Sequence, residues 1–121
     1  QAIKWCNKFK YRGKNRIVSH YIFDEKAYQT LNILKFNSYS EEWLDFVLKC
    51  RAGNDFTKYD VVIGGAVSDN IFNTMELYIE GLVDKGETIR RLGYEKPNLQ
   101  ICFKSQRAID NYLYYEGSEE I

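Results

Sequence analysis

The chain has 121 residues, enough for one domain with a single core and too few for two. Because it is 45% apolar and 16% aromatic, its composition argues against disorder. Lysine plus arginine and aspartate plus glutamate both number 17, and the resulting net charge of zero argues against nucleic-acid binding through a basic surface. The basic stretch from Lys4 to Arg16 and the acidic end from Glu116 to Glu120 are interpreted as solvated surface, a phosphate contact being the alternative for the basic stretch.

The first residues already follow a helical pattern. Apolar side chains recur at i, i+3, i+4 and i+7, namely at Ala2, Trp5, Cys6 and Phe9. No capping residue precedes them, and the sequence does not begin with methionine. We therefore expect residues 1–121 to be one unit, the C-terminal two-thirds of a larger domain, with further residues upstream of Gln1. The helix is expected to end near Tyr11, before Gly13.

Five segments rich in β-branched or aromatic residues are predicted as strands. They are Arg16–Phe23, Leu31–Phe36, Tyr59–Ile63, Leu99–Phe103 and Tyr112–Tyr115. The polar residues Asp24, Glu25 and Lys26 end the first of these.

Helices are predicted where serine or aspartate precedes an apolar pattern, since these side chains cap helix N-termini. The predicted caps are Ser38–Glu41, opening a helix from Tyr39, then Ser68 or Asp69, then Asp84–Glu87, and Ser105. Gly53 and Gly93 are expected to end the first and third of these helices. Strands and helices that interleave through short connections indicate an α+β domain.

The inward positions of these elements define a predicted core. The residues expected to be largely buried are Trp43, Phe46, Val61, Ile63, Met75, Tyr78, Ile101 and Phe103. The helix after Ser68 is also expected to turn Ile71 and Leu82 inward. No run approaches the ~20 apolar residues that a membrane helix needs.

Cysteine usage points to a reducing compartment. Cys6, Cys50 and Cys102 are odd in number and widely spaced, and the sequence has no CxxC pair or Cys/His cluster that could bind zinc. Each lies in an apolar pattern, so we expect three reduced, partly buried thiols in a cytoplasmic protein.

Three features of the sequence could take part in catalysis or ligand binding. His20 is the only histidine and the required base of any Cys–His or Ser–His pair, but a half-buried strand histidine explains it equally simply. Gly64–Gly65 after an apolar strand resembles part of a phosphate-binding loop, although a turn with positive φ explains the pair as well. Asp60 is either an orienting carboxylate or an edge residue.

Four blocks taken together resemble a known family. They are Leu31–Phe36, Glu42–Val47, Tyr59–Gly64 and Gln100–Phe103, with the sequences LNILKF, EWLDFV, YDVVIG and QICF. In order and spacing they are similar to the bacterial "domain of unknown function 3990" family over roughly residues 1–115. That family resembles the ADP-ribosyltransferase superfamily in fold, and some of its members look like toxins encoded beside a small partner protein.

The resemblance implies a fold of two small, mainly antiparallel sheets with packed helices, and an NAD-dependent mono-ADP-ribosyltransferase activity. It implies NAD as the substrate, and a small antitoxin-like protein as the partner if the protein is the toxin of a toxin–antitoxin pair. Gln100 corresponds to the late-strand Glu or Gln of that superfamily and is the expected catalytic residue. The two earlier NAD-gripping elements are expected upstream of Gln1, and Lys104 stands where the family often has histidine.

Strand parity indicates where Gln100 lies. Leu99, Ile101 and Phe103 share one face of their strand, and Gln100 shares the other with Cys102. We expect the three apolar residues to be buried and Gln100 to face an open cleft, where its amide could donate and accept hydrogen bonds but could not act as a base. The alternatives are a plain solvated amide and, for the whole chain, a non-enzymatic protein-interaction domain.

Overall fold

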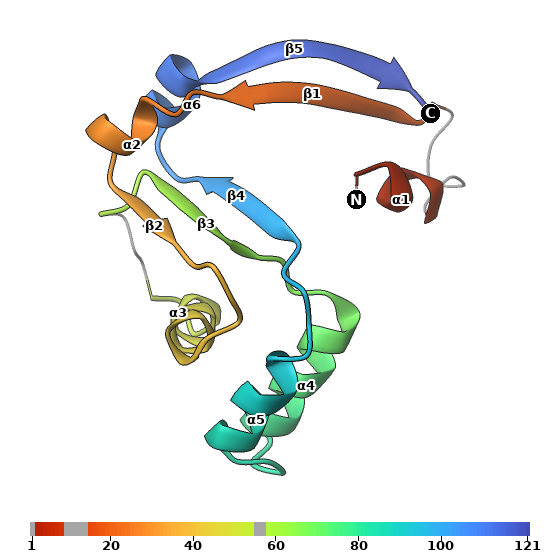
Figure 1. Ribbon diagram of the computed structural model, residues 1–121, viewed down its shortest axis with the longest axis vertical. Coiled ribbons are helices and arrows are strands. Elements are labelled where there is room, and N and C mark those ends of the chain that lie inside the picture. Colours follow the sequence, from red (N-terminus) through yellow and green to blue (C-terminus); the bar gives the residue numbers. More distant parts are fainter. Residues whose placement is uncertain (1, 9–14, 55–57) are drawn as a thin grey trace.

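The structure is a computed structural model that describes residues 2–8, 15–54 and 58–121, and within these residues the chain forms two small sheets (Figure 1). Strand β1 (Ile17–Phe23) pairs antiparallel with β5 (Leu113–Glu120). In the second sheet, β3 (Val61–Gly65) lies between β2 (Ile33–Lys35) and β4 (Leu99–Phe103). It runs parallel to β2 and antiparallel to β4. The predicted α+β class with two small sheets is therefore confirmed.

The helices begin where capping side chains lie. Their bounds are Ala2–Lys8 (α1), Ala27–Thr30 (α2), Glu41–Arg51 (α3), Asp69–Ile79 (α4), Lys85–Leu92 (α5) and Gln106–Tyr112 (α6). The side chains of Ser40, Ser68, Asp84 and Ser105 each accept the backbone N–H three residues later, which satisfies a donor that the first helical turn leaves free. These caps confirm the predicted helix starts within two or three residues.

The structure corrects the predicted elements at several points. The last strand begins after Tyr112, which ends α6, and continues to Glu120. The predicted elements do not include α2, a single turn whose Ala27 is fully buried. Phe9, Tyr11 and Gly13 lie outside the described residues, so the predicted end of α1 is not described.

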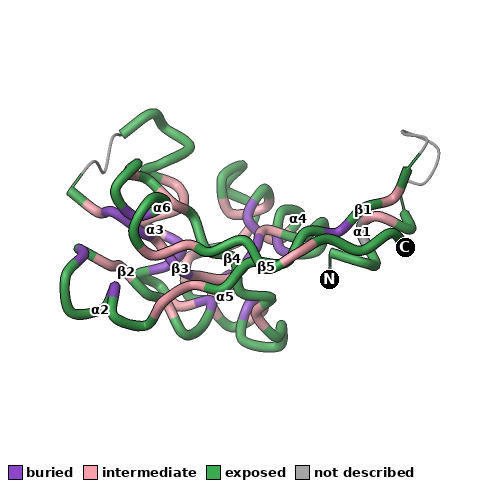
Figure 2. The backbone as a smooth tube through the Cα atoms, turned by 90° about the horizontal axis from the view of Figure 1, so that it is seen from above, coloured by how far each residue is buried: buried purple, intermediate pink, exposed green. Residues whose placement is uncertain are grey.

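The core residues form two clusters, and Figure 2 marks the buried positions along the chain in purple. The helical cluster lies among α3, α4 and α5 and consists of Tyr39, Trp43, Leu44, Ile71, Met75 and Leu92. The sheet cluster lies where α2 and α6 meet the β2–β3–β4 sheet and consists of Ala27, Leu31, Val61, Ile63 and Ala108. All three of the larger helices thus contribute buried side chains to the helical cluster.

The predicted core is correct in its centre and wrong at β4. Trp43, Val61, Ile63 and Met75 are buried, whereas the predicted residues Phe46, Tyr78 and Phe103 are only half-buried. Ile101 is 44% exposed and therefore lies outside the core, because β4 is an edge strand and no described element covers its outer side. Leu82 is also exposed, since α4 ends at Ile79.

The glycine pair after the apolar strand serves packing rather than a turn. Gly64 and Gly65 are the last residues of β3, and neither has a positive φ, so the turn interpretation is wrong. A Cβ on Gly65 would overlap the ring of Tyr39, whose hydroxyl donates a 2.7 Å hydrogen bond to the carbonyl oxygen of Ala66. The missing side chain allows Tyr39 to lie against the strand and join the helical cluster.

No helix in the described part of the chain is long and apolar enough to cross a membrane.

Truncating Trp43 tests the helical cluster. Its side chain is 2% exposed, so Trp43→Ala should lower the free energy of unfolding by about 3–5 kcal/mol, measured by urea denaturation followed by circular dichroism. The matched control is Leu82→Ala at an exposed position, which should change the free energy by less than about 0.5 kcal/mol. Equal effects of the two substitutions would contradict the assigned cluster.

The two glycines provide a second test. Gly65→Ala should destabilise the protein by about 1–3 kcal/mol, because the added methyl group forces the Tyr39 ring to move. Gly64→Ala is the neighbouring control, since its Cβ would meet Phe36 and Trp43 at 3.4 and 3.5 Å, which are ordinary contacts. Thermal unfolding of both variants should rank Gly65→Ala as the less stable.

Candidate functional site

The two sheets meet at one aromatic contact and diverge from it. The rings of Phe23 and Phe103, the last residues of β1 and β4, lie 5.5 Å apart between centroids. Both strands therefore run toward this contact, and their first residues, Ile17 and Leu99, lie at the open end of a wedge (Figure 1). An opening between diverging strands of two sheets is a place where a ligand can reach main-chain and side-chain groups together.

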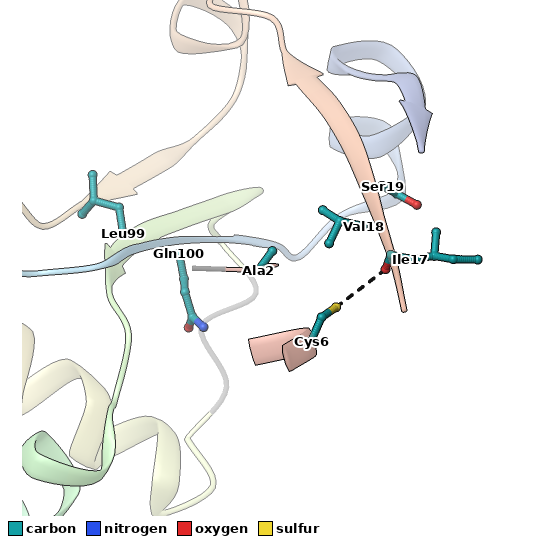
Figure 3. A pocket seen from close by; sticks show the side chains of 7 residues that line it. All are labelled: Ala2, Cys6, Ile17, Val18, Ser19, Leu99 and Gln100. Atoms are coloured by element: carbon teal, nitrogen blue, oxygen red, sulfur yellow. Dashed lines mark hydrogen bonds between the residues drawn. The ribbon is translucent and has the colours of Figure 1, made fainter. Parts of the chain in front are cut away.

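The open end of the wedge holds a pocket of about 560 Å³. Its lining comes from three elements, with Ala2 and Cys6 of α1, Ile17, Val18 and Ser19 of β1, and Leu99 and Gln100 of β4 (Figure 3). The Cys6 thiol donates to the carbonyl oxygen of Ile17 at 3.8 Å and so ties α1 to β1. Every lining side chain that the structure describes is uncharged, which favours a neutral group as the occupant of this part.

Gln100 stands at the boundary between this pocket and a smaller one of about 120 Å³. The smaller pocket lies between α3 and the β3–β4 face, and three aromatic side chains line it, those of Phe36, Trp43 and Phe46. Gln100 is opposite Gly64 in the β3–β4 register, so no side chain on β3 blocks it. Its exposed amide therefore borders both pockets. Figure 3 shows it among the residues of the larger one.

The predicted environment of β4 is correct for Gln100 and wrong for its neighbours. Gln100 is exposed beside a pocket and Cys102 lines the smaller pocket on the same face, as strand parity predicts. On the opposite face Leu99 is 56% exposed, so this face is not the buried one that we expected. Whether Gln100 is catalytic stays a prediction.

His20 does not join a nucleophilic site. It lies exposed on β1, and its Nε2 is 3.2 Å from Oε1 of Glu119 on β5. His20 is therefore an exposed surface residue paired with Glu119, and the prediction that it is half-buried is wrong.

The cysteines are less buried than predicted. All three are free, Cys6 is partly buried, and Cys50 and Cys102 are exposed. Among the residues that the structure describes, no group of three or more His, Cys, Asp or Glu side chains could hold a metal ion.

Asp60 is a buried structural carboxylate rather than an edge residue. Its two oxygens accept hydrogen bonds from Nε and Nη2 of Arg107 on α6 at 2.8 and 2.6 Å, and Oδ2 also accepts the backbone N–H of Asn32 at 2.9 Å. The Arg107 guanidinium is the main reason why the pKa of Asp60 lies well below its usual range, helped by the Ser105 side chain and the Asn32 amide. The pairing with Arg107 could not be predicted from local patterns, because the two residues are far apart in the chain.

These features define an α+β domain whose two sheets diverge from an aromatic contact and expose a neutral pocket bordered by one strand amide. The chain belongs to the family described as "protein of unknown function (DUF3990)", whose model matches residues 1–115. Comparisons with curated proteins and with solved structures find no match.

Asp60 predicts how stability depends on pH. Because its pKa is lowered in the folded state, the ionised carboxylate stabilises the fold above its ordinary pKa of 3.8, and this contribution is lost as pH falls below that value. At pH 7, Asp60→Asn should cost about 1–3 kcal/mol. Between pH 5 and pH 2, the free energy of unfolding of Asp60→Asn should then fall less than that of the native chain.

The control for this pH series is Glu116→Gln, at an exposed carboxyl of β5. It should keep the full pH dependence of the native chain in urea denaturation. If Asp60→Asn shows the same acid-induced loss as the native chain, the ion pair with Arg107 is not the source of the stabilisation.

Proposed function

We propose that the protein is an ADP-ribosyltransferase-like enzyme that uses NAD as its substrate, with Gln100 as the site residue of this part of the chain. The supporting observation is the position of Gln100. Its amide is exposed beside the pocket where the two sheets diverge, and no side chain of β3 opposes it. The resemblance of the Gln100–Phe103 block to the late strand of the superfamily supports the same assignment.

The chemistry of Gln100 limits its role to positioning. A primary amide offers one oxygen that accepts and two N–H groups that donate, so it can hold a ribose hydroxyl and orient an acceptor at once. It does not titrate near neutral pH and therefore abstracts no proton. Reaction requires groups from several elements to converge on NAD, so Gln100 would act together with other residues of the site.

The proposal includes a cellular setting. Three free cysteines suit the cytoplasm, where thiols stay reduced. A toxin role with a small antitoxin-like partner follows from the resemblance, and growth of cells that express the protein with and without its neighbouring gene tests it.

A second candidate function is a non-enzymatic protein-interaction domain. The specific observation that favours it is the exposed apolar strand β4, where Leu99 and Ile101 are both accessible. A degenerate relative of the enzyme fold would keep this surface and lose turnover of NAD.

Replacing Gln100 tests the enzymatic proposal. In the complete protein as expressed from its gene, Gln100→Ala should lower the rate of nicotinamide release from NAD at least 100-fold and leave the melting temperature nearly unchanged, because the side chain is exposed. Gln29→Ala, at an exposed amide of α2, is the matched control and should keep full activity.

Two results would contradict the proposal. Undiminished activity of Gln100→Ala would make Gln100 an ordinary surface amide. Failure of the unaltered complete protein to consume NAD with any added acceptor would favour the interaction domain instead.

A further inference from the structure

The outer edge of β4 carries main-chain groups without partners. The backbone N–H of Ala66 donates to the carbonyl oxygen of Asn98, and that of Lys104 donates to Asp60, which fixes the alternation of the antiparallel ladder. Gln100 and Cys102 therefore turn their N–H and C=O groups toward β3, and Leu99 and Ile101 turn theirs away from it. None of these outward groups bonds to any residue that the structure describes.

The facing edge of β1 shows the same alternation. The N–H of Ile121 donates to the carbonyl oxygen of Arg16, so even-numbered residues at the start of β1 face β5. Ile17 and Ser19 turn their main-chain groups outward, on the side where β4 lies (Figure 1). Among the described residues, only the Cys6 thiol reaches these groups, at the carbonyl oxygen of Ile17.

A comparison with β5 shows that the β4 edge lacks protection. The free edge of β5 carries Glu116, Glu119 and Glu120 and has an irregular register opposite His20 and Tyr21, features that discourage pairing with another strand. β4 has the sequence LQICF, with no charge, proline or bulge. An exposed, uncharged, apolar edge of this kind is a template for a further strand.

The exposed area leaves room for a partner. The chain exposes 8650 Å², whereas a compact monomer of its mass of 14.3 kDa exposes about 6,800 Å². The excess of about 1,800 Å² is more than twice the roughly 800 Å² that one side contributes to a standard protein interface.

We propose that the wedge between β4 and β1 binds one short extended strand of a partner protein, which pairs with Leu99 and Ile101 on one edge and with Ile17 and Ser19 on the other. The wedge suits a single strand, because residues of both edges, Ile17 and Ser19 of β1 and Leu99 of β4, line the same pocket. The strand carries small, uncharged or apolar side chains, since the side chains that line this pocket within the described residues are uncharged. It joins the two sheets into one.

The strand would share its pocket with the NAD of the proposed function, because Leu99 and Gln100 both line it. Main-chain pairing occurs at the strand edge, whereas the Gln100 side chain projects from the sheet face, so the two can be tested separately.

The probe is a seven-residue peptide of alternating valine and threonine, titrated into the chain and followed by hydrogen exchange. Binding should slow exchange of the amides of Ile101 and Ser19 at least tenfold and leave that of Gln100, already paired with β3, unchanged. Two further peptides are N-methylated on the valine amides or on the threonine amides. Each of these peptides can still donate hydrogen bonds along one edge but not along the other. If the strand bonds to both β4 and β1, neither peptide should bind.

Side-chain variants complete the test. Leu99→Glu should weaken peptide binding at least tenfold by placing a charge in the neutral wedge, and Leu82→Glu, at an exposed apolar residue outside it, should leave binding unchanged. Binding of either methylated peptide would show docking on a single edge and overturn insertion. The absence of saturable protection at Ile101 and Ser19 would overturn the docking site itself. Neither result bears on turnover of NAD, which Gln100→Ala reports.

Discussion

The ion pair between Asp60 and Arg107 is the interaction on which the larger sheet depends. The carboxylate of Asp60 accepts hydrogen bonds from Arg107 of α6 and from the backbone N–H of Asn32, just before β2. The backbone carbonyl oxygen of Asp60 accepts the N–H of Lys104, just after β4. One residue at the entrance of the central strand thus fixes both of its neighbours and the helix that covers them. The side chain of Asp60 is 8% exposed while that of Arg107 is 58% exposed, so loss of the arginine would leave a buried charge poorly compensated.

Local patterns predicted much of the fold. Four helix starts follow from a capping side chain and its neighbours, and β4 was predicted with its observed bounds because proline and a charged residue flank an apolar run. Burial along β4 was not predictable in the same way. The apolar residues Leu99 and Ile101 suit a core strand, but burial depends on which element lies beyond the strand, and that depends on the whole topology.

The candidate site was likewise predictable only where it depends on local sequence. Strand parity placed Gln100 and Cys102 on one face, because alternation is a local property of any strand, but it did not reveal that the face of Leu99 and Ile101 is exposed as well. The wedge beside it depends on Phe23 meeting Phe103 and on the N-terminal helix reaching β1, contacts between residues far apart in the chain. The catalytic assignment of Gln100 rests on resemblance and on position, and its chemistry awaits the assay of NAD turnover.

Pairing of the first and last strands has a consequence for the order of folding. The helical cluster consists of residues between Tyr39 and Leu92, so its contacts form within one continuous stretch, whereas Ile17 must find Glu120 across nearly the entire chain. Closing a long loop costs more conformational entropy than closing a short one, and contacts distant in sequence form slowly. We expect the amides of α3 to α5 to gain protection first during refolding, and those of β1 and β5 to gain it last, which pulse-labelled hydrogen exchange would resolve.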